Sequence, residues 1–94
     1  MHTYQLNFEN YQQIIHIKDS LERYLNHGIM PGGFLTAVLS NDLTSTFSHA
    51  DHINYGLIGD MVKFLYNEFP IGAWGSRENV LAWVQMCKEE NTNV

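Results

Sequence analysis

Residues 10–31, NYQQIIHIKDSLERYLNHGIMP, carry the pattern that decides the fold. Apolar side chains recur there every three or four positions, which places them on one face of an α-helix. Gly28 stands where a left-handed residue ends a helix, and Pro31 prevents the helix from continuing. The stretch therefore predicts a helix over residues 10–27. Its apolar face comprises Ile14, Ile17, Leu21, Tyr24 and Leu25.

A second helix is expected over residues 34–48, where apolar residues again recur at helical spacing. The Ser/Thr run at 44–46 disfavours a helix, because these side chains compete for backbone hydrogen bonds. A break and restart near Asn41-Asp42 is therefore the alternative to one continuous helix.

Two more helices complete the pattern. Asp51 is a suitable N-cap for a third helix over residues 52–68, and Ser76 is a suitable N-cap for a fourth over residues 77–89. No stretch shows sustained strand alternation between hairpin turns. We therefore expect an all-α bundle of about four helices joined by short turns.

Composition sets the broad class of protein. The chain has 94 residues, so we expect a single helical domain over residues 1–94. An apolar content of 45% and a charged content of 16% are typical of a globular protein, and a net charge of −5 argues against general nucleic-acid binding. The one cysteine, Cys87, excludes an internal disulfide and is expected to be buried on the fourth helix. Neither a signal peptide nor a membrane-spanning run is present, so we expect a cytoplasmic protein without membrane association.

Motifs of the common enzyme classes are absent from the sequence, including nucleophile elbows, P-loops and dinucleotide fingerprints. A metal site is conceivable at His49, Asp51 and His52, but the Asp51 carboxylate is already expected to cap a helix. Asp42 and Asp51 could form a carboxylate pair, yet solvated surface residues or a clamp between helices is the simpler interpretation. We expect a protein that is not an enzyme and has no resident metal or cofactor.

The two glycines before the second helix are the most distinctive feature for binding. They leave backbone N–H groups uncovered at a helix start, where the helix dipole favours an anion such as phosphate. The other interpretation is a tight turn that uses glycine for its permissive angles. If the turn binds an anion, the expected ligand-binding residues are Arg23, Gly32, Gly33, Phe34, Thr36, Asn41, Asp42 and Trp74.

Aromatic residues make up 13% of the chain, and several do not fall on the apolar faces of the predicted helices. Aromatic side chains left over in this way indicate a partner surface or a stacking platform. We therefore expect a homo-oligomer, such as a two-fold dimer or a dimer of dimers. The aromatic residues in question are Tyr4, Phe8, Tyr11, Tyr55, Tyr66 and Trp74.

The stretch PGGFLTAVLSNDL at residues 31–43 belongs to a longer pattern that includes FLYNE at 64–68 and Trp74-Gly75-Ser76. This pattern resembles a group of small accessory proteins of tailed phages and prophages. The similarity covers about residues 20–84, and its PGGFLxAVLxNDL motif is fairly specific. Members often carry Gly-Arg-Ala-Asp where this chain has Ser48-His49-Ala50-Asp51, which removes an arginine. The resemblance implies a phage accessory protein acting in the host cytoplasm, and it supplies no catalytic residue.

Two functions follow as expectations. The first is a non-enzymatic antagonist of host defence that sequesters a small anionic, nucleotide-like ligand at the glycine-opened helix. The alternative is an interaction protein that binds and inhibits a host protein directly through an apolar and acidic face. Only five Lys and Arg residues are available in the chain, which is few for a ligand with several phosphates.

Overall fold

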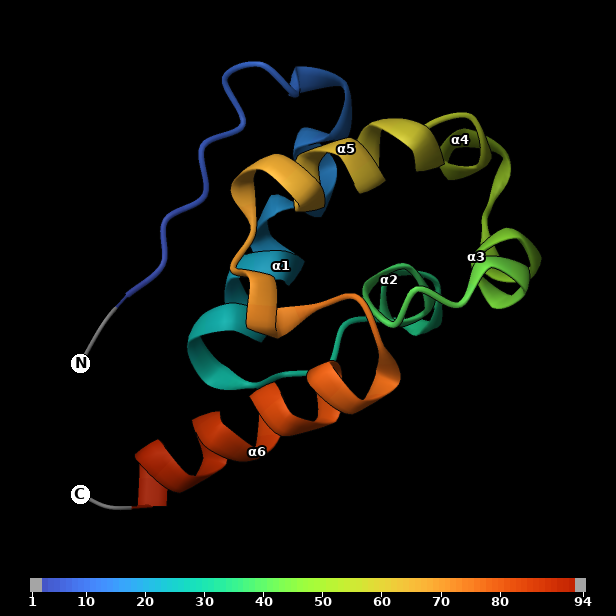
Figure 1. Ribbon diagram of the computed structural model, residues 1–94. Helices are drawn as coiled ribbons and strands as arrows, with labels where there is room; N and C mark the ends of the chain where they lie inside the picture. Colours follow the sequence, from blue (N-terminus) through green and yellow to red (C-terminus); the bar gives the residue numbers. More distant parts are fainter. Residues whose placement is uncertain (1–2, 93–94) are drawn as a thin grey trace.

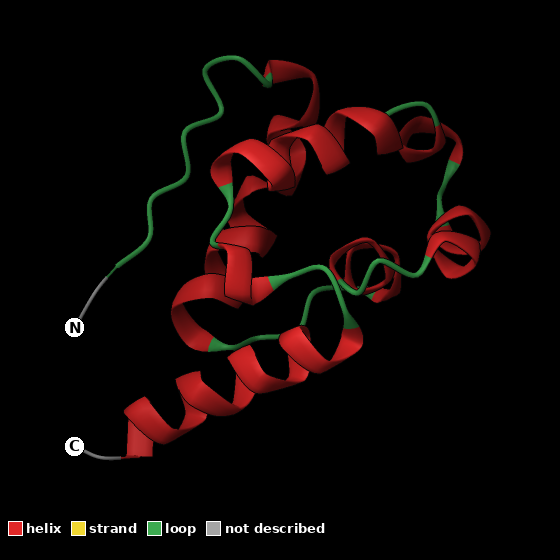
Figure 2. Cartoon of the chain, in the orientation of Figure 1, coloured by secondary structure: helices red, strands yellow, loops and turns green. Residues whose placement is uncertain are grey.

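Helices make up all the regular structure of residues 3–92, the part of the chain that the computed structural model describes (Figures 1 and 2). The expected all-α class is confirmed for these residues. The expected count of about four helices is wrong, because six α-helices and two short 3-10 helices are present among them. Three of the expected helices are interrupted, each for an identifiable reason. No helix of the described part is both long and apolar enough to cross a membrane.

The first expected helix, 10–27, forms as two connected elements. A 3-10 helix, η1 (Gln12–Ile17), leads into α1 (Lys18–His27), and the backbone leaves helical geometry at Ile14. The Ile14 side chain is completely buried, so core packing overrides a regular helical start. Gly28 ends α1 as expected, with a φ of 67° and its N–H bonded to the Tyr24 carbonyl oxygen at 2.9 Å.

The second expected helix, 34–48, divides at the alternative break point. α2 (Gly33–Leu39) ends before Asn41, which has a φ of 58°. Asn tolerates this left-handed conformation better than most residues. Asp42 then accepts a hydrogen bond from the Ser45 N–H (3.1 Å) and caps α3 (Leu43–His49).

The third expected helix, 52–68, is interrupted at Gly56. Asp51 caps α4 (His52–Tyr55) by accepting a hydrogen bond from the Asn54 N–H, as expected. Gly56 is the C-cap of α4, and the chain resumes as α5 (Ile58–Glu68). α3 and α4 together (residues 43–55) are called the arm below.

The last helix is close to its predicted bounds. α6 (Arg77–Thr92) follows a short 3-10 helix, η2 (Ile71–Ala73). The Ser76 hydroxyl accepts a hydrogen bond from the Asn79 N–H (3.0 Å), so the expected N-cap is confirmed. The helix runs past the expected end at 89.

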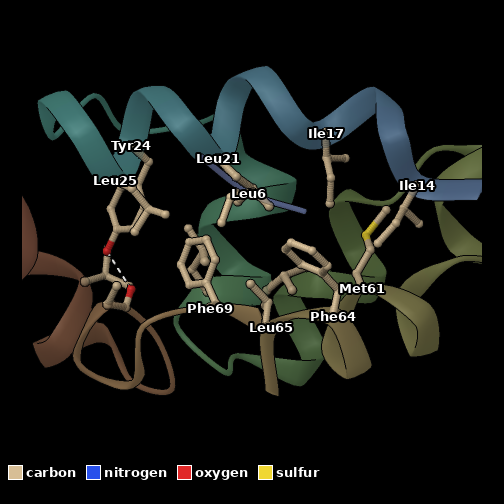
Figure 3. Packing of buried hydrophobic residues seen from close by; sticks show 14 of the residues in the cluster. Leu6, Ile14, Ile17, Leu21, Tyr24, Leu25, Met61, Phe64, Leu65 and Phe69 are labelled. Atoms are coloured by element: carbon tan, nitrogen blue, oxygen red, sulfur yellow. Dashed lines mark hydrogen bonds between the residues drawn. The ribbon is translucent and has the colours of Figure 1, made fainter. Parts of the chain in front are cut away.

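The core lies where η1 and α1 pack against α5. Figure 3 shows Ile14, Ile17 and Leu21 pointing toward the apolar side chains of α5. At one end of this interface the buried Tyr24 hydroxyl donates a hydrogen bond to the Ala73 carbonyl oxygen (2.7 Å; Figure 3). The side chains that α5 and the residue after it contribute are Met61, Phe64, Leu65 and Phe69.

α6 packs against α1 on another side of that helix (Figure 1). The two helices approach most closely at Gly28, where an added Cβ would lie 2.8 Å from the Cβ of Cys87. Cys87 is buried, as expected, and its thiol lies 3.6 Å from the Leu25 carbonyl oxygen. Gly28 is therefore required both for its left-handed backbone and for the close packing of α1 on α6.

Most of the aromatic residues expected on a partner surface belong to the core instead. The N-terminal segment before η1 places Phe8 on Phe64, with ring centroids 4.2 Å apart, and Tyr11 packs edge-on against the same ring. Tyr4 packs against Trp83, and Trp74 is partly buried against the core cluster. Of the six residues, Tyr55 and Tyr66 remain exposed. The N-terminal segment, which lacks helical periodicity, thus packs its aromatic side chains against the core, although they did not fit the apolar faces of the predicted helices.

Candidate functional site

An open groove of about 640 Å³ lies between α2, α3 and the start of α6. This volume is within the usual range for sites that bind small molecules. The turn after α2 creates it: the N–H groups of Asn41 and Asp42 return to the carbonyl oxygens of Val38 and Ala37, and α3 then runs back beside α2. The groove is lined by Pro31, Gly33, Thr36, Ala37, Ser40, Asn41, Asp42, Leu43, Thr44, Ser45, His49 and Arg77.

His49 presents one nitrogen to a further partner. Its Nδ1 lies 2.9 Å from the Ser45 carbonyl oxygen, which can only accept, so Nδ1 carries a hydrogen. Nε2 is then the nitrogen that remains for a further partner, and with the hydrogen on Nδ1 it accepts a hydrogen bond. The ring rests against α2, because a Cβ on Gly33 would lie 3.2 Å from His49 Cδ2. Gly33 therefore makes room for this imidazole.

Arg77 supplies the positive charge of the groove. Among the described residues that line the groove, no other is a Lys or an Arg. The Arg77 guanidinium forms no hydrogen bond or ion pair in the described part of the chain. Arg77 is also the first residue of α6, where the helix dipole disfavours a cation. An anion bound in the groove would offset that unfavourable position.

The polar groups of the groove divide into those already used and those still available. Asp42 is used, because its carboxylate caps α3. The Thr36 hydroxyl donates to the Pro31 carbonyl oxygen (2.9 Å) but keeps its capacity to accept. The hydroxyls of Ser40, Thr44 and Ser45 have no hydrogen-bond partner in the described part of the chain. The groove thus offers these three hydroxyls, one guanidinium and one imidazole nitrogen to a ligand.

The structure brings together only half of the residues expected to bind a ligand. Gly33, Thr36, Asn41 and Asp42 line the groove. The other four, Gly32, Phe34, Arg23 and Trp74, do not.

Two of the missing residues line a different hollow. Gly32 and Phe34 face a space of about 310 Å³ between η1, α2 and α4. His16 and Asn54 bridge this space, with Nε2 of the histidine 2.7 Å from Oδ1 of the asparagine. The expected single site is therefore two hollows that share Gly33.

Arg23 and Trp74 lie outside both hollows. The Arg23 guanidinium points along α1 to the Ser20 hydroxyl (3.4 Å). It shares a shallow depression with Asp19 and Glu22, whose carboxylates oppose anion binding. Trp74 is partly buried and packs against the core cluster. Arg23 is close to the glycine turn in sequence, but the sequence alone does not show which side of α1 faces that turn.

The start of α2 is a weaker anion site than the sequence suggested. No described side chain caps this helix, so its first N–H groups remain open. The helix is seven residues long, however, and it begins beside the His49 ring. The binding capacity of this region lies along the groove and not in the helix dipole.

The conceivable metal site does not assemble. Within the described residues, no group of three or more His, Cys, Asp or Glu side chains is arranged to hold a metal ion. Asp51 caps α4, and His49 is bonded to the Ser45 carbonyl oxygen.

Sequence reasoning missed four polar residues of the groove as ligand contacts: Thr44, Ser45, His49 and Arg77. The possible break at Asn41-Asp42 was the available signal, because a break there folds α3 back onto α2. Arg77 lies 35 residues or more along the chain from the α2–α3 turn, and only the tertiary fold brings it to the groove.

Comparison of this chain with protein-family models, with curated proteins and with solved structures finds no match. What the groove binds is therefore inferred from its own residues.

Proposed function

We propose that this protein is a non-enzymatic accessory protein of a tailed phage or prophage that sequesters a small anionic, nucleotide-like ligand in the groove beside α2. In this proposal it acts in the host cytoplasm and counters a host defence. The observation that carries the ligand class is the unpaired Arg77 guanidinium, which shares the groove with the available Nε2 of His49. Guanidinium groups bind phosphate oxygens through charge-assisted hydrogen bonds.

The arrangement favours binding over chemistry. The Asp42 carboxylate caps α3, and no Ser or Thr hydroxyl of the described lining is hydrogen-bonded to His49, so the groove holds no assembled pair of nucleophile and base. The groove is also open, which suits a ligand held by a few polar contacts. An antagonist that only removes a signal from solution needs no more than this.

Isothermal titration calorimetry against a panel of linear and cyclic nucleotides tests the proposal. Arg77→Gln should weaken binding of any nucleotide that binds by about tenfold or more, because a charge-assisted hydrogen bond is lost. Lys63→Gln is the matched control: it removes the same charge from an exposed position on α5 that does not line the groove. Absence of heat with every member of the panel would overturn the proposal.

A second candidate function rests on the arm. Leu43 is 69% exposed, Tyr55 is 59% exposed, and Phe47 packs edge-on against Tyr55 with ring centroids 5.2 Å apart. An exposed cluster of large apolar side chains is typical of a protein-binding surface. We propose as the alternative that this face binds and inhibits a host protein directly.

A pull-down from host lysate tests the alternative. Leu43→Ser combined with Phe47→Ser should abolish capture of the partner. The control combines Tyr66→Ser and Ile71→Ser, which change large apolar residues outside the arm that are even more exposed than Leu43 and Phe47. A lysate that yields no reproducible partner, or equal capture by both double variants, contradicts the alternative.

The first proposal includes a homo-oligomer, in which a second copy of the chain covers the exposed face of the arm. In the alternative, a host protein covers that face. Native mass spectrometry separates the two functions. An oligomer that dissociates in the Leu43→Ser/Phe47→Ser variant supports the first proposal, whereas a monomer leaves the face open for a host protein. The same spectrum reports the mass of any ligand that is retained through purification.

A further inference from the structure

We infer that the groove recognises a sugar monophosphate, and that a nucleotide binds there through its phosphate and ribose while its base remains unread. This inference rests on the proposed function and specifies which part of the ligand is recognised. It follows from three properties of the lining residues: their charge, their hydroxyl groups and the absence of Phe, Tyr and Trp side chains among them.

The charges of the groove fit one phosphate group. Arg77 can donate to phosphate oxygens, while the Asp42 carboxylate adds a negative charge to the same lining. The sequence contains no Lys or Arg between residues 24 and 62, so α2 and the whole arm supply no further cation. A second phosphate would therefore meet the Asp42 carboxylate without a compensating positive charge.

The uncharged polar groups suit a sugar. Ser40 and Thr44 present hydroxyls without partners in the described chain, and the Asn41 side chain lies beside them in the lining. Hydroxyl and amide groups both donate and accept hydrogen bonds, which is what the hydroxyls of a ribose require. Arg77 and these groups together can bind a phosphate and the sugar attached to it.

The described residues that line the groove include one ring, the imidazole of His49, and its face rests against Gly33 at the start of α2. Phe, Tyr and Trp are all missing from the lining, and the nearby Phe47 ring packs against Tyr55 on the arm. Recognition of a base in a small-molecule site relies on stacking or on contacts to its edges. A base attached to the bound ribose would therefore extend into the open side of the groove.

Calorimetry on the full chain tests this inference with five probes: ribose 5-phosphate, AMP, UMP, ribose and inorganic phosphate. We expect ribose 5-phosphate, AMP and UMP to bind within about threefold of one another, because their shared part makes the contacts. Ribose and inorganic phosphate should each bind at least about tenfold more weakly than ribose 5-phosphate.

The outcomes separate this inference from the proposed function. If AMP binds but ribose 5-phosphate does not, or if AMP and UMP differ by more than about tenfold, the base is read. The inference then fails while the proposed function stands. If inorganic phosphate binds as tightly as ribose 5-phosphate, the sugar is not read and the inference also fails. If none of the probes and no nucleotide binds, the proposed function itself fails.

Side-chain variants locate the sugar contacts. Ser40→Ala combined with Thr44→Ala should weaken ribose 5-phosphate by about threefold to tenfold and leave inorganic phosphate unchanged. Ser48→Ala is the matched control, since Ser48 is an exposed serine of α3 outside the lining. Thermal melts followed by circular dichroism establish that each variant is folded. Equal affinity of the double variant and the control for ribose 5-phosphate would overturn the placement of the sugar.

Discussion

Two regions of this molecule contrast sharply in how they are built. Where η1, α1 and α5 meet, large side chains such as Tyr24, Leu21 and Phe64 are almost completely buried. In the arm, Thr46 is the buried residue of α3, and α4 has none. Figure 1 shows the arm at the edge of the molecule, away from α1 and α6. Folding free energy is therefore concentrated in the core, and the candidate binding surfaces lie on the arm and on the parts of α2 and α6 beside it.

This contrast explains why the groove can be open without endangering the fold. Apolar burial stabilises the core, so the polar groups beside α2 need not pack tightly. The arm is held by local caps at Asp42 and Asp51 and by its contacts with α2. Such regions open at lower free energy than the core and tolerate substitution at their surface.

The most direct way to break the comparison is one substitution made in both regions. Leu21→Ala in the core should lower the free energy of unfolding by about 2–5 kcal/mol, because Leu21 is 1% exposed and its loss leaves a cavity. Leu43→Ala in the arm should lower it by less than about 0.5 kcal/mol. Urea unfolding followed by circular dichroism measures both values. Equal losses would show that the arm is part of the same packed core.

Close packing at Gly28 gives the next largest expected effect. Gly28→Ala should cost about 2–4 kcal/mol, because it forces a Cβ into a left-handed residue and against the Cβ of Cys87. Gly72→Ala is the control, since no described atom lies within 4 Å of the added Cβ there. Urea midpoints for the two variants provide the test. An unchanged midpoint for Gly28→Ala would mean that α1 and α6 can separate at no cost.

The sequence predicted the class of fold and most of its local signals, because those depend on neighbouring residues. The stop at Gly28 and the N-caps at Asp51 and Ser76 each involve residues within a few positions of one another. The helix count failed where long-range packing decides the geometry. Ile14 leaves helical geometry because the core takes its side chain, and spacing along the chain does not report this.

The candidate site was only half predictable for the same reason. Gly33, Thr36, Asn41 and Asp42 are close in sequence, and they also lie together in the groove. Arg77 reaches the groove only through the packing of α6, and that distance along the chain hid it. Trp74 is absent from the groove lining, and its ring packs partly against the core cluster, a long-range contact that the sequence does not report.

Alkaline pH should destabilise the core through its buried titratable groups, and this effect is smaller than those of the two substitutions above. Burial raises the pKa of the Tyr24 phenol above its usual value near 10, and the neighbouring Cys87 adds to this shift. The folded state therefore keeps its proton while the unfolded state loses it, so stability is full below about pH 10 and falls as the pH rises above that value. Burial also raises the pKa of the Cys87 thiol, with Glu90 as a lesser cause, and this shift also lowers stability as the pH rises.

Tyr24→Phe isolates the contribution of the phenol. At neutral pH it should lower the free energy of unfolding by about 1–2 kcal/mol, since the Ala73 carbonyl oxygen loses its donor. Above about pH 10 the variant should lose less stability with rising pH than the parent protein. Urea unfolding at a series of pH values measures the slope. Parallel slopes for the two proteins would contradict the burial of this hydroxyl.

The smallest expected effect concerns Asn41, which is both a turn residue and a lining residue of the groove. Asn41→Gly should raise the free energy of unfolding by up to about 1 kcal/mol, because glycine adopts its φ of 58° without strain, and Asn41→Ala should lower it by a similar amount. Both variants remove the side-chain amide, so they should weaken ribose 5-phosphate equally if that amide contacts the sugar. Normal affinity in Asn41→Gly would restrict Asn41 to shaping the turn. The arm would then contribute to binding through the position of α3 and the hydroxyl of Thr44, not through this amide.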